Sequence, residues 1–196
     1  MKKLRVCPKS AIEYDFWNVS RAGNGYIGGF PKGLLARIKE KGWIKGDVVV
    51  NLFGGFVGKK HPDWLNVDIN KWVYPTIIAD SHHSPLKNEI ADTIILDPPY
   101  DDPTTRFTGA ALYGVKPLSV IGVLKEAIRI AKAGTYIILL HFLVPPAPKI
   151  VKRIAVIAVW QGPNHRIRAL SVYRKNGISE NTEQTKLLEA DKKDIP

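Results

Sequence analysis

Short apolar runs rich in β-branched residues recur along this chain, and longer amphipathic or irregular stretches separate most of them. Turn-forming residues bound each run, which is typical of strands that are buried on both faces. Such strands belong to a mostly parallel sheet covered by helices, so the pattern predicts an α/β fold. The seven predicted strands are 48–53, 65–69, 76–79, 93–97, 135–141, 154–160 and 167–173.

The last two predicted strands are separated by a short turn around residues 162–164, whose sequence is Gly-Pro-Asn. This connection is too short for a helical crossover, so the two strands should pair as an antiparallel hairpin. Two helices are also predicted, because apolar residues recur at helical spacing between flanking proline and glycine residues. One runs from Pro31 to about Lys41, and the other from about Pro117 to Lys132.

The composition is that of one packed domain: of 196 residues, 45% are hydrophobic and 24% are charged. We expect a single domain over residues 1–178 and a polar C-terminal extension over 179–196. The single cysteine, Cys7, excludes an intramolecular disulfide and a thiolate metal cage. The sequence has no apolar run long enough to span a membrane and no signal-peptide core at its start, so we expect a cytoplasmic protein without membrane contact.

The chain is strongly basic, with a formal net charge of +11, and this charge bears on the class of its partner. The last eighteen residues carry five acids and three lysines, so the excess of positive charge lies on the preceding part of the chain. A folded basic domain concentrates polyanions around itself, and nucleic acid is the common polyanionic partner of a cytosolic protein. Solubility alone is the alternative explanation of the charge.

The most specific string is Asp97-Pro98-Pro99-Tyr100, which follows the apolar run 93–96 directly. Ligands of open α/β sheets bind outside the carboxyl ends of the strands. There an acid and an exposed carbonyl can accept both hydrogens of a planar amino group, while a tyrosine ring stacks on the ring that bears it. The prolines fix the direction of the carbonyl, because proline fixes φ. A plain stop between a strand and a loop is the alternative.

This string resembles the signature of class I S-adenosylmethionine-dependent methyltransferases that methylate exocyclic amino groups of bases in DNA or RNA. The resemblance implies a Rossmann-like sheet of the class I methyltransferase type. It also implies a catalytic role for the whole string, in which Asp97 and the Pro98 carbonyl hold the target nitrogen, Pro99 stiffens the loop and Tyr100 stacks on a flipped base.

The same resemblance implies S-adenosylmethionine as the cofactor. A glycine-rich turn follows the first predicted strand, and Asp68, at the end of the second strand, is placed to bind both ribose hydroxyls. Asp80 ends the third strand and resembles the residue beside the adenine amino group. A turn or cap role is the alternative for both acids. A core aromatic that precedes a helix is the alternative for Phe30. The expected cofactor-binding residues are Phe30, Asn51, Phe53, Gly54, Gly55, Asp68, Ile69, Asp80 and Ser81.

The first motif departs from the family pattern, because Asn51 stands where an acid is usual and the glycines fall at positions 54, 55 and 58. The chain also lacks an obvious target-recognition domain. Two sets of residues are expected to contact nucleic acid instead, with a solvated loop or surface as the alternative. They are Arg106, Phe107 and Tyr113 beside the presumed target pocket, and Arg166 and Arg168 at the predicted hairpin.

We expect no metal, because the histidines are scattered and none has a second ligand at a zinc-like spacing. The sequence thus predicts a methyltransferase that acts on an exocyclic amino group of a nucleic-acid base, with adenine N6 in DNA as the leading target. An RNA adenine-N6 or guanine-N2 methyltransferase of the same fold is one alternative. A non-catalytic nucleic-acid-binding module with a degenerate methyltransferase fold is the other.

Overall fold

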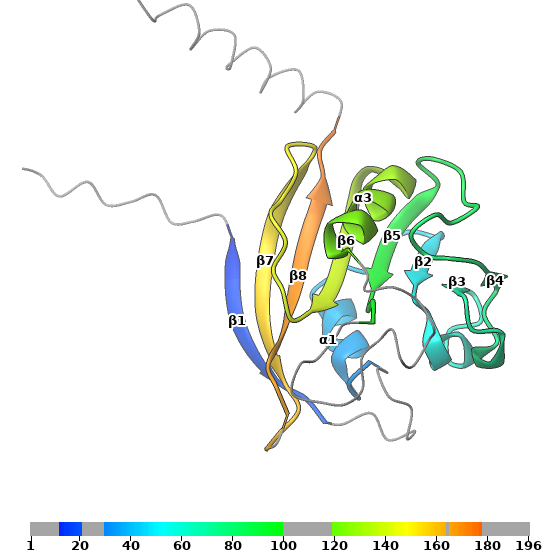
Figure 1. Cartoon of the computed structure of the whole chain (residues 1–196). Coiled ribbons are helices and arrows are strands. Elements are labelled where there is room, and N and C mark those ends of the chain that lie inside the picture. Colours follow the sequence, from blue (N-terminus) through cyan, green and yellow to red (C-terminus); the bar gives the residue numbers. More distant parts are fainter. Residues whose placement is uncertain (1–11, 21–29, 100–118, 164, 178–196) are drawn as a thin grey trace, which may run out of the picture.

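A computed structural model describes residues 12–20, 30–99, 119–163 and 165–177 of the chain. Figure 1 shows the helices and strands in these segments. The strands are β1 (Glu13–Asn18), β2 (Val49–Leu52), β3 (Leu65–Asp68), β4 (Ile77–Ile78), β5 (Ala91–Leu96), β6 (Ala131–His141), β7 (Val151–Trp160) and β8 (Arg168–Lys175). The α-helices are α1 (Leu34–Glu40) and α3 (Val120–Ile130), and the 3₁₀ helices are η1 (Gly55–Lys59) and η2 (Lys71–Val73).

All eight strands form one sheet in the order β1-β7-β8-β6-β5-β2-β3-β4. Every pairing is parallel except those of β8, which runs antiparallel to both β6 and β7. The mostly parallel α/β sheet and its closing β7–β8 hairpin therefore confirm the predicted fold class.

The prediction of seven strands was wrong, because β1 adds an eighth strand at the edge of the sheet beside β7. Only Trp17 is buried in β1, and the other residues of that strand are exposed. An edge strand with one neighbour buries little of its surface, so the segment lacks the continuous apolar run that identifies the inner strands.

The first predicted helix begins later in the structure than expected, and the second ends earlier. The helix expected from Pro31 begins at Leu34, because Gly33 adopts a left-handed conformation with φ of 85° at its N-terminal boundary. In the segment predicted as a second helix, the described part of α3 runs from Val120 to Ile130 and leads directly into β6, which starts earlier than the predicted Thr135.

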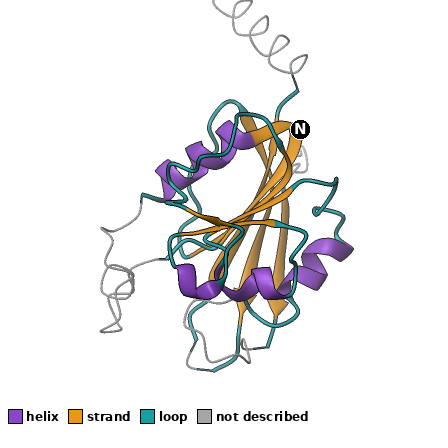
Figure 2. Cartoon of the chain, turned by 90° about the vertical axis from the view of Figure 1, so that its right-hand side faces the viewer, coloured by secondary structure: helices purple, strands orange, loops and turns teal. Residues whose placement is uncertain are grey.

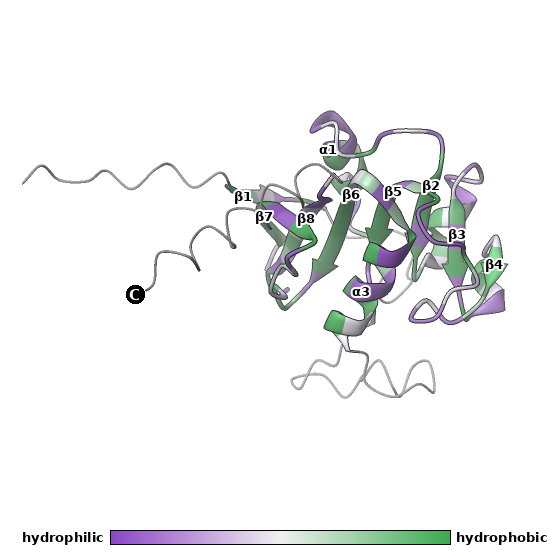
Figure 3. Cartoon of the chain, turned by 90° about the horizontal axis from the view of Figure 1, so that it is seen from above, coloured by the Kyte–Doolittle hydropathy of each residue, from purple (hydrophilic) through white to green (hydrophobic). Residues whose placement is uncertain are grey.

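Helices cover both faces of the sheet. Figure 2 shows the strands in the centre with helices on either side, and Figure 3 shows α1 and α3 on opposite faces. Two apolar clusters fill these layers. One joins α3 residues such as Leu124 to Ile94 and Leu139, and the other joins Leu34 and Ile38 of α1 to the opposite side of the same strands. The core explains why the inner strands are mostly apolar.

The parallel strands β4, β3, β2 and β5 lie side by side, so their carboxyl ends meet at one edge of the sheet. This carboxyl edge is where an open α/β sheet binds its ligands. The residues that we singled out from the sequence follow four different strands. The order of those strands brings them to one rim of the molecule.

Candidate functional site

Three acids and one turn line the carboxyl edge. Asp97 follows β5, the turn from Phe53 to Gly55 follows β2, Asp68 ends β3 and Asp80 follows β4. Leu52 pairs with Leu96, and Asp68 pairs with Ile78, so the ends of neighbouring strands are level. Asp97 is thus on the same rim as the glycine turn, as the interpretation of this rim as a ligand site requires.

The turn after β2 is held by bonds from its neighbours. Phe53 has φ of 59°, an uncommon left-handed conformation for a bulky residue. Its N–H donates to Ser81 Oγ at 3.1 Å, and that hydroxyl donates to Val67 O at 3.3 Å. Ser81 therefore ties β2 to β3 beneath the turn, which is a structural use of a residue expected to bind cofactor.

Asn51 and Asn66 form a buried amide pair below the same turn. Asn51 Nδ2 donates to Asn66 Oδ1 at 2.9 Å and to Gly54 O at 3.3 Å, while Asn66 Nδ2 donates to two backbone carbonyls. A Cβ added to Gly54 or Gly58 would meet Asn66 at 3.2 Å, so both glycines permit close packing on this amide. Asn51, an expected cofactor contact, is fully buried and bonded within the turn.

Asp68 fastens the turn from the other side. Its Oδ2 accepts from the Gly55 N–H at 2.9 Å, and its Oδ1 accepts from the Asn70 N–H at 2.8 Å. Each carboxylate oxygen has two acceptor sites, so this carboxylate retains capacity for ligand hydroxyls. Ile69, the next residue, is half exposed and offers apolar surface beside it.

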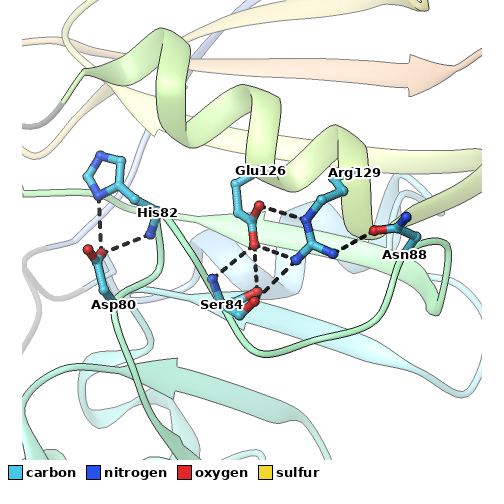
Figure 4. A network of polar contacts seen from close by, with 6 residues as sticks. All are labelled: Asp80, His82, Ser84, Asn88, Glu126 and Arg129. Carbon is cyan, nitrogen blue, oxygen red and sulfur yellow. Dashed lines mark hydrogen bonds and ion pairs between the residues drawn. The ribbon is translucent and has the colours of Figure 1, made fainter.

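Asp80 lies next to these residues, because Ala79 N–H donates to Asp68 O at 3.1 Å. Its Oδ1 accepts from the His82 N–H at 2.9 Å and lies 3.2 Å from His82 Nδ1 (Figure 4). Burial raises the pKa of Asp80, but the hydrogen bonds from His82 outweigh it, and the net pKa is below the usual value. The side chain is exposed and ionised at neutral pH.

A polar network fixes the loop that carries Asp80 (Figure 4). Glu126 of α3 accepts from the Ser84 N–H at 2.9 Å and from the Ser84 hydroxyl at 2.8 Å. Arg129 binds the same carboxylate at 2.6 Å and also donates to Asn88 Oδ1 at 2.7 Å. Burial raises the pKa of Glu126, but Arg129 and Ser84 reverse this effect and lower it overall.

Asp97 is buried, and its partner is Arg168 of β8. Arg168 Nη1 lies 3.4 Å from both carboxylate oxygens, and the two residues are 7% and 4% exposed. Arg168 Nη2 donates to Gln161 Oε1 at 3.1 Å. Burial raises the pKa of Asp97 to about 6, although the positive charge of Arg168 opposes the shift.

The expected phosphate contact Arg168 therefore belongs to the candidate site itself. A signal in the sequence could have placed it there, because the first residue of an antiparallel last strand lies at the carboxyl edge of the parallel strands. His141, in contrast, was not among the residues expected at the site. It ends β6, between β5 and β8, is buried, and accepts the Leu143 N–H at Nδ1 over 2.9 Å. Burial lowers the pKa of His141.

The remaining expected site residues differ in their burial and in whether the structure describes them. Pro98 is buried and Pro99 is partly buried, while Phe30 packs against the apolar cluster that contains α1. Arg166 is exposed, with its guanidinium 5.7 Å from the Phe142 ring centroid. Four expected residues lie outside the described part of the chain. They are Tyr100, Arg106, Phe107 and Tyr113.

Within the described segments, no group of three or more His, Cys, Asp or Glu side chains is arranged to hold a metal ion. The helices of those segments all fall short of the length and apolarity that a bilayer span demands.

No family model and no curated protein matches the chain. Similar solved structures include a SAM-dependent methyltransferase from Aquifex aeolicus, 12% identical over 71% of this chain and 87% of that one, with a TM-score of 0.44. Another is the 16S rRNA (adenine(1408)-N(1))-methyltransferase of Catenulisporales acidiphilia, 12% identical over 70% and 90% of the two chains, with a TM-score of 0.40. A third similar structure, from Methanococcus maripaludis, is 15% identical with a TM-score of 0.37. The chain spans only about half of that protein's length, 52%.

Proposed function

We propose that the chain is an S-adenosylmethionine-dependent methyltransferase that acts on an exocyclic amino group of a nucleic-acid base, with adenine N6 in DNA as the first target to test. Adenine N6 or guanine N2 in RNA are the alternative targets. The observation that carries the proposal is the position of Asp97-Pro98-Pro99 at the carboxyl edge, beside the glycine turn and level with Asp68 and Asp80.

The carboxyl edge has the chemistry that a nucleoside cofactor needs. The carboxylate of Asp68 has acceptor sites left for ribose hydroxyls, Ile69 offers apolar surface for a flat base, and Asp80 presents an exposed acceptor beside it. We therefore assign cofactor binding to these three residues and to the backbone of Phe53 and Gly55. When bound, S-adenosylmethionine supplies a methyl group activated by a sulfonium.

The chain itself orients and desolvates the nucleophile. Asp97 is buried, so a hydrogen bond from a base amino group to its carboxylate forms with little competition from water. A carboxylate has about four acceptor sites, so Asp97 can contact Arg168 and an amino group together. Alignment and electrostatics of this kind are sufficient for transfer from an already activated donor.

A radiolabelled methyl-transfer assay on duplex DNA, single-stranded DNA and total RNA, followed by nucleoside digestion, tests the proposal and identifies the base. We expect transfer by the native chain, and its loss in Asp97→Ala with cofactor affinity nearly unchanged. Asp63→Ala, an exposed acid in the β2–β3 connection, is the matched control. Full turnover by Asp97→Ala would remove Asp97 from the mechanism.

A second candidate is a non-catalytic nucleic-acid-binding module. It is favoured by the burial of Asp97 against Arg168 and by the hydrogen bonds that the buried Asn51 amide donates to Asn66 and Gly54. Isothermal titration with S-adenosylmethionine separates the two candidates. Absence of heat at millimolar ligand, together with retained nucleic-acid binding, would favour the module.

A further inference from the structure

A face rich in lysine and aromatic side chains lies at the η1–η2 side of the carboxyl edge, beyond β3. We call this surface the η1–η2 face, and it consists of Lys59, Lys60, Lys71, Trp72 and Tyr74. Trp72 is 71% exposed and Tyr74 is 67% exposed, although both are large aromatic residues. The two short helices are the cyan and teal turns at the lower right of Figure 1, beside β3 and β4.

The two rings are held outward by their backbone. Val73, between them, is only 1% exposed and anchors the turn in the core. The Trp72 N–H donates to Asn70 Oδ1 at 3.0 Å, which caps η2. Tyr74 has φ of 56°, and its N–H donates to Lys71 O at 3.2 Å. A bulky residue rarely adopts this conformation unless its surroundings enforce it, so the exposed position of the Tyr74 ring is built into the fold.

Lysines lie directly on these rings. Lys59 Nζ is 4.9 Å from the Tyr74 ring centroid and 5.0 Å from that of Phe56, so it bridges η1 and η2. Lys71 Nζ is 5.0 Å from the Trp72 ring centroid. Cation–π contacts at these distances hold the ammonium groups beside the exposed ring faces.

The segment from Phe53 to Asp80 carries three lysines and three acids, so the lysines act here through their placement on the exposed rings and not through a net charge. Asp68 is engaged by backbone amides, and Asp80 is paired with His82. Asp63 is exposed and is the remaining acid of the segment from Phe53 to Asp80. Lysine is depleted in protein–protein interfaces, so three lysines among exposed rings disfavour a protein partner. Stacking platforms flanked by cations are the composition that binds unpaired bases and their phosphates.

We propose that the η1–η2 face binds a single-stranded segment of nucleic acid, with bases stacked on Trp72 and Tyr74 and phosphates against Lys59, Lys60 and Lys71. The proposal names a docking surface for the substrate class of the proposed function and rests on it. A strand held there lies on the same edge as Asp97, so it would lead a target nucleotide along the carboxyl ends of the strands. This surface is separate from Arg166 and the hairpin.

Fluorescence anisotropy with a labelled oligothymidine and a matched hairpin duplex tests the proposal. Stacking on an aromatic side chain contributes about 1–3 kcal/mol per base, so Trp72→Ala and Tyr74→Ala should each weaken oligothymidine binding by roughly 5- to 150-fold. The triple variant Lys59→Ala/Lys60→Ala/Lys71→Ala should reduce the slope of log K against log salt by about 2, since each phosphate contact on a single strand contributes about 0.7.

Matched controls are Tyr14→Ala, an equally exposed tyrosine on β1, and Lys87→Ala, an exposed lysine outside the face. Both should bind as the native chain does. Thermal unfolding of every variant checks that the fold is retained, and Trp72→Phe should preserve most of the binding because the ring remains. Unchanged oligothymidine affinity in Trp72→Ala and Tyr74→Ala would overturn the proposal. If these two variants lost as much affinity for the hairpin duplex as for oligothymidine, the proposed preference of the face for single strands would be overturned.

The result is distinguishable from a failure of the proposed function. The anisotropy assay contains no S-adenosylmethionine, so its outcome does not depend on methyl transfer. A chain that binds through Trp72 but transfers no methyl group would refute the methyltransferase and keep the docking surface. Binding to anionic lipid vesicles, with loss of oligothymidine binding, would assign the face to a membrane and overturn the proposal.

Discussion

The Asp97–Arg168 pair combines two opposing effects on one carboxyl group. Removal from water disfavours the charged form, whereas the neighbouring guanidinium favours it. Burial is the larger effect, since the pKa of Asp97 rises to about 6. Asp97 is therefore mostly ionised at neutral pH but close enough to its pKa for mild acid to protonate it.

This shift predicts a pH dependence of stability. The folded pKa lies above the usual aspartate value, so the folded state binds the proton more tightly than the unfolded state. The contribution of Asp97 to the free energy of unfolding should be greatest below about pH 4 and should decline as the pH rises through 6. Urea unfolding from pH 4 to 7 measures it in native and Asp97→Asn chains.

The difference between the two chains isolates Asp97 from the other titrating groups. A difference that is flat across this range would show that the carboxyl group has an ordinary pKa. In Arg168→Met the favourable charge is absent, so the decline should extend to higher pH.

Asn66 gives a second prediction at the scale of single residues. Its amide oxygen accepts from Asn51 Nδ2, and its amide nitrogen donates to the carbonyls of His61 and Trp64. Asn66 itself is only 1% exposed. Asn66→Ala would leave these partners without their bonds, so we expect a loss of about 2–3 kcal/mol in the free energy of unfolding.

Chemical denaturation measures the loss. Asn88→Ala is the control, because Asn88 is exposed and makes one side-chain bond to Arg129. If Asn66→Ala were as stable as Asn88→Ala, the amide pair would not be what supports the turn.

At the scale of elements, α3 fixes the loop that carries Asp80 and Ser81 to the sheet. Glu126 is the centre of this connection, since it binds both the loop through Ser84 and the helix through Arg129. The loop itself has little regular structure, so its position depends on these bonds.

Glu126→Ala should therefore loosen the loop more than it loosens the helix. Hydrogen exchange should accelerate in residues 80–89, because the Ser84 N–H loses its acceptor, while exchange in β5 and β6 stays slow. The affinity for S-adenosylmethionine should fall as Asp80 loses its fixed place.

Lys125→Ala, on the exposed side of the same helix, should change neither the hydrogen exchange of residues 80–89 nor the affinity for S-adenosylmethionine. Uniform acceleration across the molecule in Glu126→Ala would mean that Glu126 supports the whole fold and not the loop.

For the whole molecule, β1 extends the sheet beyond the seven strands of the sequence prediction. Trp17 is 5% exposed and its ring centroid lies 6.1 Å from that of Trp43, which follows α1. An edge strand anchored by one tryptophan joins the cooperative core through that residue.

Trp17→Ala should lower the free energy of unfolding by about 3–5 kcal/mol, the usual cost of deleting a buried large aromatic side chain. Tyr14→Ala, on the same strand with 67% exposure, should cost little. Thermal denaturation of the two variants makes the comparison. Equal stabilities would indicate that β1 frays without affecting the rest of the sheet.

Local sequence pattern was enough to predict the type of sheet and the position of the acids along it. Apolar runs such as 93–96 and the tight turn at 162–164 were sufficient, because burial on both faces and turn length are local properties. They also identified Asp97, Asp68 and Asp80 as residues that end strands.

The contacts that those residues make could not be predicted in this way, because they depend on the order of the strands in the sheet. The side chains of Asp97 and Arg168 are 71 positions apart, and strand order alone brings β8 close enough for the two to meet. Asn51 likewise supports the turn from below because Asn66, on the adjacent strand, lies opposite it and accepts its hydrogen bond. Partners of this kind depend on which strands are neighbours, and local pattern does not encode that order.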